Sequence, residues 1–183
     1  MSIQIRPEIE GLKDTIISTR RDIHQHPELA FDEHRTSKLV AKRLESFGIE
    51  VQTGVGKTGV IGTLNGNAGK TIALRADMDA LPIQETSDIS YKSKNDGIMH
   101  ACGHDGHTAM LLGTAEIISQ NVEKLNGTVK FLFQPAEEGQ GGARYMIEDG
   151  ALNDVDEVYG IHLWNYQKYG TVGVKSGPIM AAA

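Results

Sequence analysis

Apolar positions along the chain recur in two alternating patterns, one helical and one typical of strands. Helical spacing of apolar residues predicts helices over 8–25, 33–47, 107–120 and 141–150. Short runs rich in β-branched, aromatic and other apolar residues predict strands at 49–53, 59–64, 71–76, 128–133 and 157–163, with a further strand at 170–174. Because strands alternate with helices, we expect an α/β fold in which helices flank a mainly parallel sheet.

Composition and charge narrow the class of protein. The 183 residues carry a net charge of -6 and the basic residues are scattered, which argues against nucleic acid as a partner. No apolar stretch is long enough to span a bilayer, and the first residues lack the pattern of a signal peptide. Cys102 is the single cysteine, so no intramolecular disulfide can form. We therefore expect a cytoplasmic protein that does not act at a membrane.

Polar residues follow three of the predicted strands. Asp77 comes directly after 71–76, the pair Glu137-Glu138 follows 128–133, and His162 lies near the end of the strand that begins at Glu157. In open α/β sheets, functional sites form outside the carboxyl ends of strands. We therefore expect these side chains to converge on one edge of the sheet.

A fourth segment, His100–His107, contains three histidines, one cysteine and one aspartate within eight residues. Cys102 and His104 are two positions apart, so an extended backbone would direct both side chains to one face. Thiolate, imidazole and carboxylate ligands suit Zn best, with Mn, Co or Ni as further candidates. A site with two ions would need a bridging ligand, either a carboxylate or the Cys102 thiolate.

Taken one at a time, these residues have ordinary structural explanations. A lone cysteine is usually a small buried apolar residue, Asp77 could cap a turn, His162 could be a core histidine, and a Glu-Glu pair is usually solvated surface. Their combination favours a metal centre in which one glutamate binds metal and the other takes a proton from water. The remaining histidines, His24, His26 and His34, suggest no role.

Four motifs in order, RADMDALP, MHACGHDGHTA, QPAEEGQGGA and GIHLWN, resemble the N-acyl-L-amino-acid amidohydrolase and hippurate hydrolase family. This family belongs to the aminoacylase and glutamate carboxypeptidase superfamily of metallopeptidases, and RRDIHQHPELAFDE near the start matches it too. The resemblance implies a divalent metal centre, with two ions, whose ligands are Cys102, His104, Glu138 and His162. It also implies that Glu137 is the general base and that Asp77 orients the metal-binding residues. For His100 and His107 we expect supporting hydrogen bonds rather than metal ligation.

The resemblance further implies the reaction and the domain organisation. Water activated by Glu137 would attack the amide carbonyl of an N-acyl amino acid. Arg75 stands where the wider superfamily has a metal-binding histidine, and the Cys-Gly-His segment compensates. Residues 1–183 correspond to the N-terminal part of the catalytic domain, without the lid and dimerisation domain and the C-terminal catalytic part. One more metal-binding histidine would come from that later part, and the full-length form is expected to be a homo-oligomer.

Two alternatives remain open. The chain could be a catalytically inactive metal-binding remnant. It could also be a hydrolase that uses Cys102 as a nucleophile with a histidine, although this leaves Glu137, Glu138 and His162 unexplained.

Overall fold

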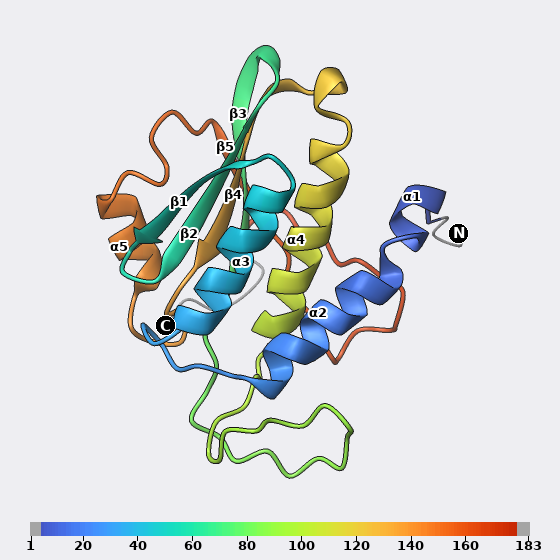
Figure 1. Cartoon of the computed structure of the whole chain (residues 1–183), viewed down its shortest axis with the longest axis vertical. Coiled ribbons are helices and arrows are strands. Elements are labelled where there is room, and N and C mark those ends of the chain that lie inside the picture. The colour runs from blue at the N-terminus through green and yellow to red at the C-terminus, as the bar shows by residue number, and fades with distance from the viewer. Residues whose placement is uncertain (1–4, 179–183) are drawn as a thin grey trace.

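A computed structural model of the chain describes residues 5–178, which form one five-stranded sheet with helices on both faces (Figure 1). The strand order is β1-β2-β4-β3-β5. The strands are β1 (Glu50–Val55), β2 (Gly59–Asn65), β3 (Asn67–Asp77), β4 (Asn126–Gln134) and β5 (Glu157–Gly160). The helices are α1 (Pro7–Glu10), α2 (Lys13–Gln25), α3 (His34–Ser46), α4 (His104–Ser119), the short 3-10 helix η1 (Val122–Lys124) and α5 (Gly142–Glu148).

Alternation along the strands divides the core into two layers. Phe131 and Phe133 of β4 face a cluster that includes α3 and α4 residues, whereas Leu132 faces a smaller cluster with Met146 of α5. Helices α3 and α4 therefore cover one face of the sheet and α5 covers the other, while α2 packs against α4.

The α/β class with flanking helices is confirmed, but the sheet is mixed rather than mainly parallel. Strand β3 runs parallel to β4 and β5, whereas β1–β2 and β2–β4 are antiparallel. Only the three residues 56–58 join β1 to β2, and a connection this short forces an antiparallel pair. The longer passage from β3 through α4 to β4 allows the parallel pair that carries the site.

Several predicted boundaries are wrong in ways that matter for the site. The helix predicted at 107–120 begins at His104, so Cys102 and His104 are not on one extended strand. Gly103 has a φ of 97°, which turns the chain into α4. The strand predicted at 157–163 ends at Gly160, and no strand forms at 170–174 within residues 5–178. At that last position Val172 and Val174 are exposed, and no strand among residues 5–178 lies beside them to pair with.

The helix predicted at 8–25 is divided at Gly11 into α1 and α2. Glycine loses more backbone entropy than other residues in a helix, which favours a break at this position. Within the described part of the chain, no helix combines the length and the apolar character that crossing a membrane requires.

Candidate metal centre

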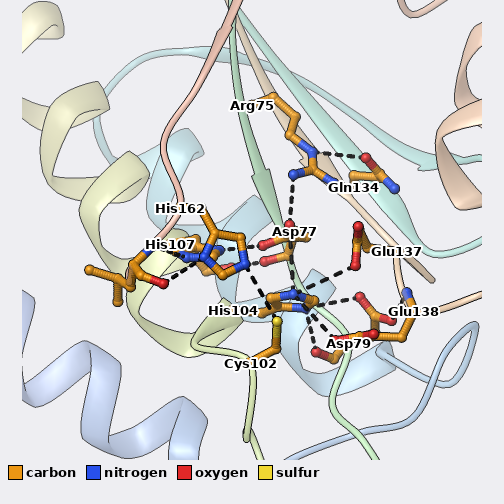
Figure 2. Close-up of polar contacts among 12 residues, drawn as sticks. Arg75, Asp77, Asp79, Cys102, His104, His107, Gln134, Glu137, Glu138 and His162 are labelled. Atoms are coloured by element: carbon orange, nitrogen blue, oxygen red, sulfur yellow. Dashed lines mark hydrogen bonds and ion pairs between the residues drawn. The ribbon is translucent and has the colours of Figure 1, made fainter. Parts of the chain in front are cut away.

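The predicted site residues meet at the carboxyl ends of β3 and β4, beside the first turn of α4 (Figure 2). Asp77 is the last residue of β3, and Glu137 and Glu138 lie in the loop between β4 and α5. The segment after β5 brings His162 to the same place. The expected convergence on one edge of the sheet is therefore observed, although no strand supplies Cys102 or His104.

His104 has one nitrogen fixed and the other free. Its Nδ1 lies 2.8 Å from the backbone oxygen of Asp79, and a carbonyl can only accept a hydrogen bond, so Nδ1 carries a proton. Its Nε2 is buried and has no hydrogen-bond partner among residues 5–178. Around Nε2 lie Asp77 Oδ2 at 3.7 Å and carboxylate oxygens of Glu137 and Glu138, each at 3.9 Å. Against the effect of burial, the nearby carboxylates of Asp79, Asp77 and Glu138 raise the pKa of His104 when no metal is bound. A cation among these carboxylates would take the place of the Nε2 proton, so the buried Nε2 is a candidate metal ligand.

Asp77 is held on two sides. Its Oδ1 accepts a hydrogen bond of 2.6 Å from His107 Nδ1, and its Oδ2 lies 2.7 Å from Arg75 Nη1 as an ion pair. Burial raises the pKa of the Asp77 carboxyl, but His107, His104 and Arg75 outweigh it and lower that pKa to about 2. Asp77 is therefore an anion at any physiological pH. Arg75, in turn, donates from Nε to Gln134 at 2.9 Å.

Both ring nitrogens of His107 are engaged. The backbone N–H of Leu163 donates to His107 Nε2 at 2.9 Å, so Nδ1 carries the proton that Asp77 accepts. His107 thus links Asp77 to the segment that carries His162, as expected for a supporting role. His100 differs, because neither of its ring nitrogens has a partner in the described residues, and burial lowers its pKa to about 4.

Cys102 and His162 form a close pair. The Cys102 Sγ atom lies 3.4 Å from His162 Nε2, while His162 Nδ1 donates to the backbone oxygen of Leu163 at 2.6 Å. Burial and the negative charges of Glu138, Asp77 and Glu137 raise the pKa of the Cys102 thiol to about 12. A thiolate at this position therefore requires a cation beside it.

The donor groups fit a divalent metal. Ligand atoms within 4.8 Å of one another form three groups: Cys102 with His104 and His162, Asp77 with His104 and His107, and His104 with Glu137 and Glu138. The three groups share His104, whose Nε2 is the unpartnered buried atom. Because the engaged nitrogens of His107 leave it no lone pair to offer, the first and third groups are the better candidates for metal ligation.

Sequence reasoning missed two residues that shape this centre. Asp79 is buried and accepts hydrogen bonds at its two carboxylate oxygens, from His104 Nδ1 at 3.2 Å and from the backbone N–H of Glu138 at 3.0 Å. Glu33 is also buried and accepts a hydrogen bond from the backbone of Ala136, just before the glutamate pair. Asp79 lies two residues after Asp77 in RADMDALP, so its position was a signal. Glu33 is the last residue of the matching segment RRDIHQHPELAFDE, but that segment gives no sign of a contact with a loop about a hundred residues away.

The chain is similar over nearly its whole length to proteins of known name. It is 52% identical over 182 residues to thermostable carboxypeptidase 2 of Saccharolobus solfataricus, covering 97% of this chain and 46% of that protein. It is 48% identical over 181 residues to an N-acyl-L-amino acid amidohydrolase of Geobacillus stearothermophilus, covering 98% and 49%. Among solved structures, it matches a Bacillus subtilis protein described as a dinuclear metal binding peptidase from the M20 family. That match has a TM-score of 0.88 and 48% identity, and it covers 92% of this chain and 48% of the other.

The chain thus spans a little under half the length of these relatives. The family resemblance predicted from the four motifs is confirmed by these similarities. A profile of one peptidase family matches residues 73–177, more than half of the chain, and this range contains every predicted site residue. The chain belongs to peptidase family M20/M25/M40.

Proposed function

We propose that this chain contributes a divalent metal centre to an amidohydrolase that cleaves the amide bond of N-acyl amino acids. The observation that carries the proposal is the buried Nε2 of His104, which has no hydrogen-bond partner in the described residues and faces carboxylates. The relative from Geobacillus stearothermophilus is named an N-acyl-L-amino acid amidohydrolase, which supports the substrate class.

In this proposal, Cys102, His104, Glu138 and His162 hold the metal. Asp77 acts indirectly: it fixes His107, whose Nε2 accepts the Leu163 N–H beside His162. Two ions per site, of Zn, Mn, Co or Ni, agree with the donor set and with the description of the Bacillus subtilis relative as dinuclear.

A divalent cation bound here would polarise the amide carbonyl and lower the pKa of the attacking water. Glu137 accepts a proton from that water and passes it to the leaving amine nitrogen. The Glu137 side chain is 41% exposed, so water and substrate have access to its carboxylate, whereas His104 is almost fully buried. This difference in exposure suits a division of labour between proton transfer and metal ligation.

We further propose that residues 1–183 form the N-terminal part of the catalytic domain of a longer protein. The support is the length of the relatives, of which this chain covers 46% and 49%. The longer form would add a lid and dimerisation domain and a further metal-binding histidine, and would act as a homo-oligomer in the cytoplasm. The lone cysteine is compatible with a reducing compartment.

A second substrate class comes from the relative named a carboxypeptidase. N-acyl amino acids and the carboxyl ends of peptides present the same reacting unit, an amide whose nitrogen bears an amino acid with a free carboxylate. A panel with both kinds of substrate separates the two classes. An amidohydrolase should cleave N-acetyl and N-benzoyl amino acids faster than dipeptides and tripeptides, and a carboxypeptidase should show the reverse order.

The test measures bound metal by elemental analysis, together with hydrolysis of that panel with Mn²⁺ or Zn²⁺ added. We expect metal in the wild-type chain and its loss in His104→Ala. Glu137→Gln should keep the metal and lower kcat by about 10²- to 10⁴-fold, because it removes only the proton acceptor. Glu123→Gln, an exposed change in η1, is the matched control and should alter neither quantity.

The outcomes separate the competing functions. Metal with turnover supports the amidohydrolase. Metal without turnover supports the inactive metal-binding remnant for this chain. Turnover that survives chelation and is abolished by thiol alkylation would establish the cysteine-nucleophile hydrolase instead. A folded chain that takes up no metal contradicts the proposal.

A further inference from the structure

A buried glutamate lies behind the loop that carries the two site glutamates. Glu33 is fully buried at the start of α3, more than a hundred positions before Glu137 in the chain. Its Oε1 accepts a hydrogen bond of 2.8 Å from the backbone N–H of Ala136. Its Oε2 accepts a hydrogen bond from the hydroxyl of Thr58, in the turn between β1 and β2. Both carboxylate oxygens of Glu33 are therefore engaged by elements next to the site.

Ala136 needs this support because its backbone is strained. Its φ is 49°, a left-handed conformation that residues with a Cβ adopt only at a cost. Such conformations persist where surrounding contacts fix them. Ala136 is fully buried, its N–H donates to Glu33, and its carbonyl accepts from the Gly142 N–H at 3.0 Å. The turn is thus held on both sides of this one residue.

The two residues after Ala136 are the site glutamates. The backbone N–H of Glu138 donates to Asp79 at 3.0 Å, and both glutamate side chains lie 3.9 Å from Nε2 of His104. The direction in which the loop leaves Ala136 therefore decides whether the two carboxylates face His104. Without Glu33, the buried Ala136 N–H would lose its acceptor.

We propose that Glu33 is a positioning residue for the metal centre: through Ala136 it holds the turn that directs Glu137 and Glu138 toward His104. This inference rests on the proposed function, because it assumes that these glutamates serve a bound metal. A glutamine at this position keeps a carbonyl oxygen that can accept from the Ala136 N–H, so it is a close substitute for Glu33.

The experiment compares matched variants of the full chain by two measurements. Cobalt(II) titration followed by visible absorption reports the affinity and geometry of the metal centre. Amide hydrogen exchange of residues 134–142 reports the loop itself. The variants are Glu33→Ala, Glu33→Gln and Thr58→Val, with Glu28→Ala as the control. Glu28 also accepts two backbone N–H groups, from Arg35 at 2.7 Å and Thr36 at 2.8 Å, but both of these belong to the first turn of α3.

We expect Glu33→Ala to weaken cobalt affinity by about 10- to 100-fold, as loss of residues that support metal ligands does. It should also speed exchange in 134–142 and alter the cobalt spectrum. Glu33→Gln keeps an acceptor for Ala136 and should restore most of the affinity, while Thr58→Val should act in the same direction as Glu33→Ala but more weakly. Glu28→Ala should lower the melting temperature without changing the cobalt spectrum or affinity.

Unchanged cobalt affinity and loop exchange in Glu33→Ala would overturn the proposal. If that variant does not fold, Thr58→Val decides, and wild-type values for it would overturn the proposal as well. A wild-type chain that binds no cobalt would instead overturn the metal centre, and the role of Glu33 with it. The two failures are distinguishable because only the second removes cobalt from the wild type.

Discussion

Cys102 lies directly before the N-terminus of α4, a position that favours a thiolate, but it also lies among carboxylates, which oppose one. Its Sγ atom lies 3.4 Å from Nε2 of His162, a distance that a Cys–His catalytic pair could also show. The distance alone therefore does not separate a nucleophile from a metal ligand. The raised thiol pKa, about 12, does, because a nucleophile must be a thiolate near neutral pH.

We predict that the Cys102 thiol is nearly inert in the metal-free chain. At pH 8, alkylation by iodoacetamide should be at least about 100-fold slower than in the urea-unfolded chain, because few molecules carry a thiolate. The rate should still be rising steeply at pH 10, since a thiol that is merely shielded but has an ordinary pKa of about 8.5 would level off by about pH 10. A rate that has levelled off by about pH 10 would contradict the raised pKa and favour the cysteine nucleophile.

Single residues with unusual chemistry could be predicted from the sequence, and residues that act through the backbone could not. Cys102, His104 and His162 are residue types that bind metals, and the structure brings the three together. Glu33 lies in the matching segment RRDIHQHPELAFDE, but nothing in that segment shows that it accepts a hydrogen bond from a backbone N–H about a hundred residues away. A pattern of side chains does not reveal which carbonyl or amide groups lie nearby.

At the scale of elements, a buried ionic cluster joins α2, α4 and the long segment between β3 and α4. His24 of α2 lies between two carboxylates, with Nδ1 2.8 Å from Asp105 and Nε2 3.2 Å from Glu85. Arg20 also donates to Asp105, at 2.8 Å. Asp105 directly follows His104, so this cluster anchors the helix start that carries the metal centre. The sequence assigned His24 no role.

We predict that His24 makes stability depend on pH. The hydrogen bond to Asp105, opposed by burial and aided by Glu85, raises the pKa of His24 above 6.5. The stabilisation by the charged imidazole is thus fully present below about pH 6.5 and is lost as pH rises through the folded-state pKa. Compared with His24→Gln, the wild type should have about 1.5–3 kcal/mol more free energy of unfolding at pH 6, and the difference should shrink toward pH 9.

Urea unfolding at pH 6 to 9 with a chelator present measures this difference. The His24 hydrogen bond helps to lower the pKa of Asp105 and of Glu85 against the effect of burial. Both carboxyls therefore stay ionised from pH 6 to 9, and of these three groups only His24 titrates in this range. His34→Gln, an exposed change at the start of α3, should leave the pH dependence as in the wild type. A difference between wild type and His24→Gln that stays constant or grows with pH would contradict the prediction.

The positions of the strands and helices could be predicted from the periodicity of apolar residues, whereas the pairing of the strands could not. The strands at the centre of the sheet were predicted to within a few residues, because alternating burial leaves a clear pattern. The antiparallel pairing of β2 with β4 was missed, since β4 inserts between β2 and β3, two strands that follow each other in sequence. The early start of α4 was missed because glycines at 103 and 106 and three polar residues obscure its first turn.

At the scale of the whole molecule, the edge of the sheet formed by β5 is exposed. Strand β5 lies at an end of the strand order, and Val158 and Tyr159 in it are 51% and 53% exposed. The segment that follows exposes further large apolar side chains, among them Ile161, Trp164 and Tyr166. An edge strand of this kind, beside an apolar surface, is a template for pairing with another chain.

We predict that the 183-residue chain self-associates through this side as its concentration rises. Size-exclusion chromatography with light scattering should show a mass that increases with concentration. Val158→Lys should shift the chain toward monomer, because a lysine on an edge strand opposes pairing. Ile17→Lys is the matched control: it replaces an exposed isoleucine, 37% accessible, on α2 and should not change the mass.

The result also bears on the metal centre, because His162 lies directly after β5 and its Nε2 is 3.4 Å from Cys102. If association orders the segment after β5, metal affinity should rise with chain concentration in the wild type and in Ile17→Lys, but not in Val158→Lys. A wild-type chain that remains monomeric at every concentration would show that the exposed edge is tolerated in isolation, and metal binding would then be a property of the single chain.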